Sequence, residues 1–274
     1  YRDGPVEPGH ARLTAAIKKN PKLIGIFSLA DGVPPPPALP VERQSFNDLV
    51  IDPDGSLRRD LVHVGGQSES HIALPLRLLE TSTGTSLRKA IESNQWKLSW
   101  LHPHAGGYST LDASGYQQML PFHKPGSFPT WSLNDLLEGK IANDELKDRI
   151  VLVGSTAPSL RDTFHTPFTR FHSGQALSEM PGVEVHAHRL AALLQAQQGG
   201  AIGIGVLPAV WEPALLLFIG ALGLGLGEGI RSLQRSGWLL LIAEVVLLAG
   251  GLVLLVSGLW VDVPSLMLTL GFIT

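Results

Sequence analysis

The chain has 274 residues, enough for one sizeable domain and a smaller second part. Its formal net charge of -3 provides no excess of basic residues, so no nucleic-acid partner is expected. Cysteine is absent, which excludes disulfides, thiolate metal sites and a cysteine nucleophile within these residues.

A change in composition near Gly200 divides the chain in two. Up to that point the sequence is mixed and polar. Beyond it there is no Lys, and the only Arg residues are Arg231 and Arg235. We therefore expect two domains, residues 1–200 and residues 201–274.

The first domain begins with short helix-like and strand-like segments. Ala11–Asn20 has helical spacing and ends before a proline, and Lys22–Leu29 has the apolar character of a strand. Residues 48–64 place two apolar stretches on either side of a Pro-Asp-Gly sequence. This arrangement is typical of a β-hairpin.

More elements are expected further along this domain. The pattern predicts helices at Ser70–Thr81 and Ser86–Ser93, and strands at Trp96–Leu101 and Gly115–Pro121. A Ser with an Asp three residues later predicts a helix start at residue 132. The continuous apolar run Asp148–Gly154 is typical of a central strand that is covered on both faces.

A helix closes the first domain. It follows Pro181 and runs to Gln197, and we expect its buried face to hold Val183, Ala187, Leu190, Ala191 and Leu194. Strands that alternate with helices predict an α/β domain with a mixed sheet and flanking helices.

A polar loop of more than 25 residues joins the predicted strand 148–154 to this helix. Long loops inside compact domains are usually functional or mobile, and this one leaves the carboxyl end of a strand, where open α/β sheets place ligands. The candidate ligand-binding residues are therefore Arg161, Asp162, His165, Thr166 and His186. A structural interpretation stays open, in which Asp162 pairs with an Arg and Thr166-Pro167 fixes a turn.

The sequence gives no sign of a metal, a cofactor or catalysis. His186 and His188 are about 200° apart around a helix, so they cannot bind one metal, and we expect His188 to face solvent. No HExxH pair, phosphate-binding loop or G-x-S-x-G motif is present. A membrane-anchored hydrolase is therefore the weakest of the functions considered.

Three apolar runs follow the first domain, and they predict an all-α bundle of transmembrane helices. The expected spans are 208–229, 238–259 and 263–274, the last being truncated. A helix needs about 20 apolar residues to cross a bilayer, which 238–259 satisfies. We expect Trp211 and Glu212 to lie in an interfacial belt.

The orientation of these spans follows from the two Arg residues. Both lie in Glu228–Gly237, so this loop is expected to be cytoplasmic and residues 1–200 extracytoplasmic. Glu244 lies inside the second span, where an ionisable group costs roughly 3 kcal/mol and suggests a functional site. The alternative is that Glu244, two turns from the cytoplasmic end, snorkels to the membrane surface.

Several separated motifs carry a family resemblance. RIVLVGSTAPSLRDTFHTPF, followed by MPGVEVHAHRLAALLQ, resembles the second type of CHASE domain, the cyclase and histidine-kinase-associated sensory extracellular domain. The matching positions are Gly154, Asp162, Thr166-Pro167 and Pro181–Ala187. DPDGSLRRDLVHV resembles the Asp-Gly-X-X-Arg-Arg turn of the family. Transmembrane spans that follow the domain are a further feature of the family.

The resemblance implies a sensory input module in the inner membrane of a bacterium, with several spans and a large periplasmic domain. It would relay a small-molecule or protein stimulus to a cytoplasmic effector in the same polypeptide, as a homodimer or a subunit of a membrane complex, with lipid around its helices. The family's opening span and an output domain are not in this sequence, so we interpret the chain as a fragment. The alternative function is a structural or docking subunit of a larger membrane complex.

Overall fold

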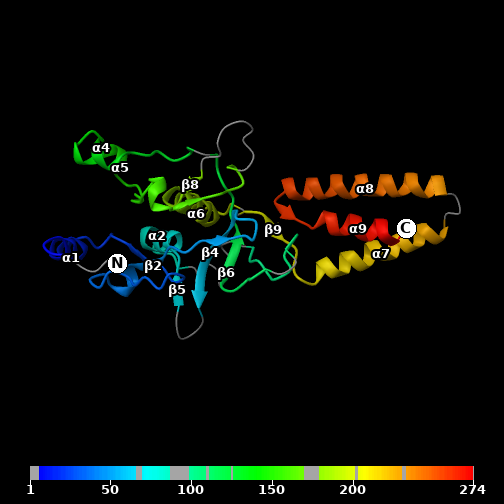
Figure 1. Ribbon diagram of the computed structural model, residues 1–274, viewed down its shortest axis with the longest axis horizontal. Helices are drawn as coiled ribbons and strands as arrows, with labels where there is room; N and C mark the ends of the chain where they lie inside the picture. The colour runs from blue at the N-terminus through cyan, green and yellow to red at the C-terminus, as the bar shows by residue number, and fades with distance from the viewer. Residues whose placement is uncertain are drawn as a thin grey trace. The chain divides into compact units, whose positions relative to one another are not determined.

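The computed structural model describes residues 6–65, 70–86, 99–108, 111–124, 126–169, 179–200, 203–229 and 233–273. Within them the chain is mixed α/β with apolar helices toward its C-terminus (Figure 1). It divides into two compact units. The α/β unit comprises Tyr1–Lys97 and Gly115–Ile202, and the helical unit comprises Leu98–Ser114 and Gly203–Thr274.

The α/β unit opens with a helix and a small parallel sheet. Helix α1 is Gly9–Lys19, and strand β1 (Gly25–Phe27) pairs with β2 (Gln44–Phe46). Lys18 and Lys19 occupy the last turn of α1, where their positive charge interacts favourably with the helix dipole and stabilises the helix. The helix and the strand predicted here are both confirmed.

An antiparallel sheet built around β4 follows. Strand β4 (Leu57–Gly65) pairs with β3 (Val50–Ile51) and β5 (Ser70–Ile72) along one edge, and with β6 (Tyr116–Met119) along the other. Gly55, with φ +79°, provides the left-handed turn between β3 and β4. The predicted hairpin and the strand near residues 115–121 are therefore confirmed.

Two helices lie side by side in this unit, α2 (Leu74–Thr83) and α6 (Gly182–Gln197) (Figure 1). Their fully buried leucines include Leu76 and Leu193, each contributing about 2 kcal/mol of burial. The helix predicted at Ser70–Thr81 begins later than expected. Its first three residues form β5, and Pro75 then sits in the first turn, where a proline is tolerated.

Helix α6 was predicted correctly, but its buried face only in part. Leu190 is buried as predicted, whereas Val183, Ala187, Ala191 and Leu194 are only half-buried. The other buried residues include Val185, Arg189 and Leu193, which a prediction from apolar spacing alone did not place there. Arg189 is instead enclosed in the protein.

Short elements make up the rest of the unit. They are α4 (Leu133–Leu137), α5 (Asn143–Leu146), and β7 (Thr163–Phe164) paired with β8 (Met180–Pro181). Ser132 Oγ accepts the Asp135 N–H at 3.1 Å, and its hydroxyl donates to Asp135 Oδ2 at 2.6 Å. This is the predicted cap at the start of α4.

The predicted central strand at Asp148–Gly154 does not form among the described residues. The segment belongs to no sheet, and Val151 and Val153 are 51% and 85% exposed. An apolar run indicates burial, but it does not supply neighbouring strands. The helix predicted at Ser86–Ser93 and the start of the strand at Trp96–Leu101 lie outside the described residues, and 99–101 is not a strand.

The helical unit holds α7 (Trp211–Gly229), α8 (Leu233–Val256) and α9 (Val263–Ile273), which run alongside one another (Figure 1). Ile219, Leu266 and Leu270 form the core between them. Within the described chain, only Gln234–Val256 is long and apolar enough to cross a membrane. A bundle of three spans, as the sequence predicted, is thus not shown.

Candidate ligand-binding site

A buried ion pair joins the central sheet to helix α6. Arg189 Nε donates to Asp60 Oδ1 at 2.5 Å, and both side chains are almost completely buried. A second guanidinium nitrogen of Arg189 donates to the backbone oxygen of Leu61 at 2.7 Å. Burying two charges is favourable only when they are well paired and hydrogen-bonded, as they are here.

His186 completes this group of side chains. Its Nδ1 lies 3.1 Å from Arg189 Nη1. Because a guanidinium can only donate, Nδ1 must accept and the ring proton is on Nε2. Burial, with a smaller effect of the Arg189 charge, lowers the pKa of His186 to about 3, so the ring is neutral at physiological pH. His186 thus contacts Arg189, and no bond to the long loop is seen among the described residues.

A second ionic group lies at the turn between β3 and β4. Asp52 accepts from Arg59 Nε at 2.7 Å and from Arg58 Nη1 at 2.9 Å. Arg58 also pairs with Asp54 at 2.7 Å, and these carboxylates raise the pKa of its guanidinium. Arg59 donates further to Gln117 of β6 at 2.6 Å, so this turn is fixed to both neighbouring strands.

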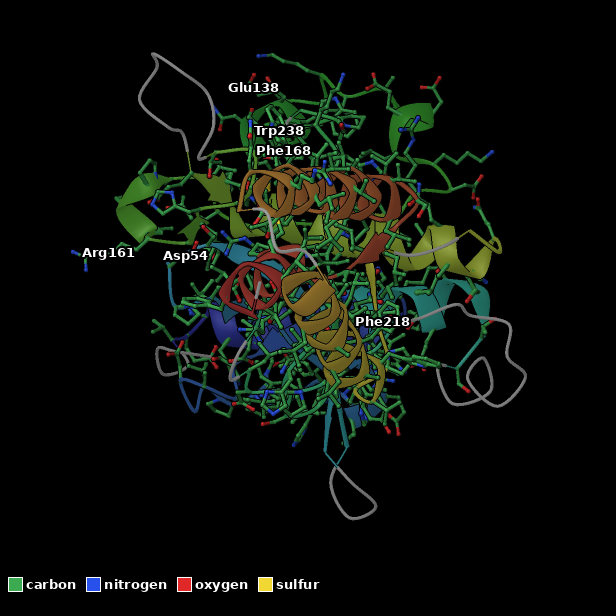
Figure 2. The ribbon with its side chains drawn as sticks, turned by 90° about the vertical axis from the view of Figure 1, so that its right-hand side faces the viewer. Asp54, Glu138, Arg161, Phe168, Phe218 and Trp238 are labelled. Carbon is green, nitrogen blue, oxygen red and sulfur yellow. The ribbon has the colours of Figure 1, made fainter. Side chains whose placement is uncertain are left out.

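The polar-loop candidates lie near β7 and β8. The Leu57 N–H donates to the His165 backbone oxygen at 2.7 Å, while the His165 ring lies 3.3 Å from Glu179 at the surface. Thr166 is fully buried, and its hydroxyl has no hydrogen-bond partner in the described structure. Arg161 is exposed and projects away from the protein (Figure 2).

Asp162 lies against the first turn of α6. Its backbone oxygen accepts the Gly182 N–H at 2.9 Å, and a Cβ at Gly182 would lie 2.4 Å from its carboxylate. Only glycine allows this approach. Partial desolvation raises the pKa of Asp162. No ion pair of Asp162 is found among the described residues, so the predicted pairing with an Arg is not seen.

Gly154 makes a similar close approach on α6. A Cβ there would lie 2.7 Å from Cβ of Val183. Gly154 and Asp162, two of the positions that carried the family resemblance, therefore lie against the start of α6, which carries a third. Close packing accounts for Gly154 and Gly182, and for the position of Asp162 beside them.

His188 was expected to face solvent, and that prediction was wrong. Its ring is fully buried, 4.9 Å from the Phe128 ring centroid and stacked on His123 at 5.9 Å. The His123 N–H donates to its Nδ1 at 3.1 Å, while Nε2 lies 4.0 Å from Glu184 Oε1 and makes no hydrogen bond within the described residues. Burial, with a smaller effect of His123, lowers the pKa of His188 to about 4.

The structure thus divides the predicted candidates. Asp162, His165 and Thr166 lie on or beside the short β7 strand, Arg161 is at the surface, and His186 belongs to the Asp60–Arg189 group. Asp60 and Arg189 themselves were missed. Charge within these elements did not single them out, because β4 also holds Arg58 and Arg59, and α6 also holds Glu184. No group of three or more His, Asp or Glu able to hold a metal occurs in the described part of the chain.

A comparison with known families adds the final observation. The sequence model of the CHASE2 domain matches residues 1–225, most of the chain. No curated protein and no solved structure matches it. The chain therefore belongs to the CHASE2 family of sensory extracellular domains.

Proposed function

We propose that this chain is the input module of a bacterial membrane signalling protein. Its CHASE2 domain receives a stimulus outside the cytoplasm, and the helices relay it to a cytoplasmic effector in the same polypeptide. The observation that carries the proposal is α8. Gln234–Val256 has 23 residues and rises about 35 Å, longer than a hydrocarbon core of about 30 Å.

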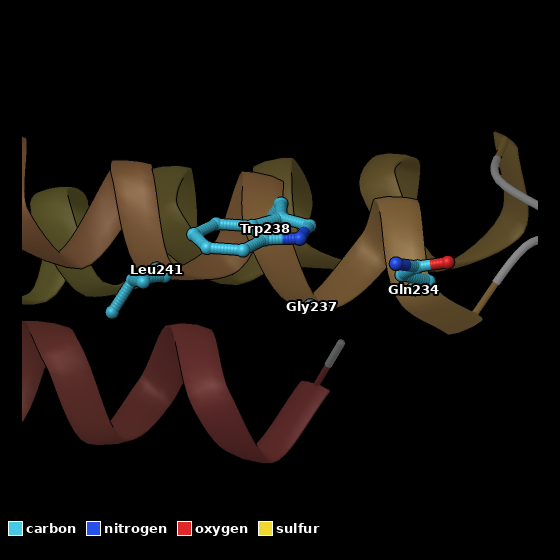
Figure 3. Close-up of a pocket in the computed structure, with 4 residues that line it drawn as sticks. All are labelled: Gln234, Gly237, Trp238 and Leu241. Atoms are coloured by element: carbon cyan, nitrogen blue, oxygen red, sulfur yellow. The ribbon is translucent and has the colours of Figure 1, made fainter.

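The surface of the helices supports a lipid environment. No residue in the most apolar stretch of α8 is fully buried by protein, whereas a core helix of a soluble protein is mostly covered. Phe218 projects outward from α7 (Figure 2). Trp238 and Leu241 line an open depression on α8 with Gln234 and Gly237 (Figure 3). A Trp near a helix end is typical of the membrane–water interface.

For the stimulus, we propose a small molecule or a protein that acts near β7 and β8. Thr166 offers a buried hydroxyl without a partner, and the His165–Glu179 pair offers an exposed polar contact. Catalysis would belong to the effector and not to this chain. A homodimer is the proposed state, because two copies allow a relative movement of their helices to carry a signal.

The absence of cysteine permits a direct test of membrane placement in the native polypeptide. Leu137→Cys places a thiol on exposed α4, and Ser236→Cys places one near the start of α8. An impermeant maleimide added to cells with an opened outer membrane should label the first thiol but not the second. Labelling of the second thiol only, or of neither before lysis, would overturn the proposed orientation.

Sensing requires a separate measurement on the same protein in lipid nanodiscs. A library of amino acids, sugars, organic acids and peptides should contain a compound that raises its unfolding temperature. Thr166→Val should reduce that shift, while Lys140→Met at an exposed ion pair should not. If no compound or periplasmic protein binds, direct sensing is refuted.

One observation favours the second function, a docking subunit of a membrane complex. Arg149–Gly154 is mostly apolar and exposed, and its backbone forms no ladder with any described strand. The backbone of such an unpaired apolar segment can pair with a β-strand from another subunit. Stoichiometric co-purification with a membrane protein, lost in Val151→Asp/Val153→Asp, would favour this function over sensing.

A further inference from the structure

The helical unit includes a loop that belongs, by sequence, to the middle of the chain. We name residues 99–108 the clasp. The Gly106 N–H of the clasp donates to Glu212 Oε1 in the first turn of α7 at 2.7 Å. A carboxylate at this position also favours the N-terminal end of the helix dipole. Glu212 therefore binds the clasp, a role that goes beyond the interfacial position predicted from sequence.

Trp260 holds the clasp from the turn between α8 and α9. A Cβ at Gly106 would lie 2.6 Å from the Trp260 ring, and one at Gly107 would lie 3.2 Å away. Gly106 also has φ +56°, a conformation that glycine adopts without strain. The Tyr108 ring packs edge-on against Trp260 with centroids 5.5 Å apart. The Trp260 indole therefore packs directly on the backbone of Gly106 and Gly107, and a Cβ at Gly106 would clash with it.

The linker into α7 provides the third attachment. Strand β9 (Gly205–Val206) pairs in parallel with β10 (Leu259–Trp260). The Val206 N–H donates to Ser99 Oγ at 3.2 Å, and His102 Nε2 donates to the Leu207 backbone oxygen at 2.8 Å. The clasp is thus fixed to the linker, to the start of α7 and to the α8–α9 turn.

Both ends of the clasp continue into the α/β unit through the chain itself. After Ser114 the chain enters β6, which pairs with β4. There Gln118 of β6 lies 3.4 Å from Asp60, the partner of Arg189. The chain from Gln118 back to Gly106, with the hydrogen bonds that these two residues make, therefore connects the buried ion pair to the start of α7 and to the α8–α9 turn.

We infer that the clasp transmits conformational changes of the α/β unit to the membrane helices, with Glu212 and Trp260 as its positioning residues. This rests on the proposed relay and names its route. Loosening the clasp should uncouple the helices from the α/β unit without unfolding either. Hydrogen exchange of the clasp amides should then rise about tenfold in Glu212→Gln, since the charged acceptor of the Gly106 N–H is replaced by a neutral amide oxygen, which binds it more weakly.

The test uses the chain in nanodiscs with one cysteine on α7 and one on α9, Ile219→Cys and Leu266→Cys, whose native side chains pack together. Disulfide formation between them reports the packing of the helices. Asp60→Asn perturbs the α/β unit at its buried pair, and Arg189→Lys replaces it if Asp60→Asn fails to fold. Lys140→Met is the control at an exposed pair.

We expect Asp60→Asn to change the cross-linking rate at least twofold when the clasp is intact. With Glu212→Gln or Gly106→Ala added, that change should disappear. If it persists, a relay exists but does not use the clasp, and the inference is overturned while the proposed function stands. If Asp60→Asn and Arg189→Lys both leave cross-linking unchanged with the clasp intact, the inference fails at its first step. Membrane placement, measured separately by maleimide labelling, shows whether the proposed function fails with it.

Discussion

Removing the charge of Asp60 should destabilise the α/β unit far more than any exposed ion pair does. Arg189 is then left buried, with a backbone oxygen and the neutral His186 ring as its remaining hydrogen-bonding partners within the described residues. Breaking a buried pair from one side costs about 3–5 kcal/mol. For a domain of this size that corresponds to an unfolding temperature lower by about 6–20 °C.

The double variant Asp60→Leu/Arg189→Met provides the decisive comparison. It removes both charges and leaves apolar side chains, and replacing a buried pair in this way is often neutral or stabilising. We therefore expect it to recover most of the temperature lost in Asp60→Asn. The exposed pair of Lys140 and Glu138, 2.6 Å apart, is worth at most about 1 kcal/mol, so Lys140→Met is the matched control.

Thermal unfolding of the chain in nanodiscs, followed by circular dichroism and by hydrogen exchange of β4 and α6, measures these differences. The reasoning is refuted if Asp60→Asn melts within about 2 °C of Lys140→Met. It is also refuted if the double variant is no more stable than the single one. Either result would mean that Arg189 finds compensation elsewhere.

Three further predictions address other parts of the chain. Burial lowers the pKa of His186 to about 3 and that of His188 to about 4, below the ordinary 6.5, so unfolding takes up protons. The stability of the α/β unit should therefore fall as the pH drops from about 6.5 toward 4. Replacing both histidines by Asn should flatten this slope in thermal melts recorded at different pH values. Gly154→Ala should lower stability by about 1–3 kcal/mol through contact with Val183, and Val183→Ala should restore part of it in chemical denaturation. Glu244→Leu should improve membrane insertion of α8 by up to about 3 kcal/mol in a glycosylation-mapping assay, and an unchanged inserted fraction would contradict placement of this residue within the bilayer.

Local patterns predicted the elements that depend on neighbouring residues. The hairpin around Gly55, the capped helix after Ser132 and the helix after Pro181 each follow from turn, cap or periodicity signals within a few positions. The apolar helices follow from composition alone. In these segments the local preference and the tertiary structure agree.

Long-range pairing explains the misses. His188 was assigned to the surface, and burial of Arg189 was not predicted, because its partner Asp60 lies 129 positions away in the sequence. The attachment of the clasp could not be predicted either, because Glu212 is 106 positions away from Gly106 in the sequence. No pattern in a single sequence specifies such pairs.

The position of Glu244 shows how a helix boundary changes an interpretation. The predicted span began at Trp238, which placed Glu244 about two turns from the cytoplasmic end. Helix α8 instead begins at Leu233, and the candidate span is Gln234–Val256, with Glu244 next to its midpoint. Its carboxylate lies 3.5 Å from where a Cβ at Gly271 would be, beside α9. In the proposed membrane placement, Glu244 is therefore farther from the surface than the predicted span had placed it, which disfavours snorkelling.

The free energy of the buried Asp60–Arg189 pair is large enough to shift a two-state conformational equilibrium of the domain. Moving an equilibrium from 1:99 to 99:1 requires about 5.5 kcal/mol of differential binding, which is close to the 3–5 kcal/mol at stake in one buried ion pair. A stimulus that rearranged Asp60 and Arg189 would therefore act on a group large enough to switch the domain, without disturbing its apolar core. In the proposed relay, β6 carries such a rearrangement along the chain toward the clasp, whose contacts with Glu212 and Trp260 would pass it to the helices.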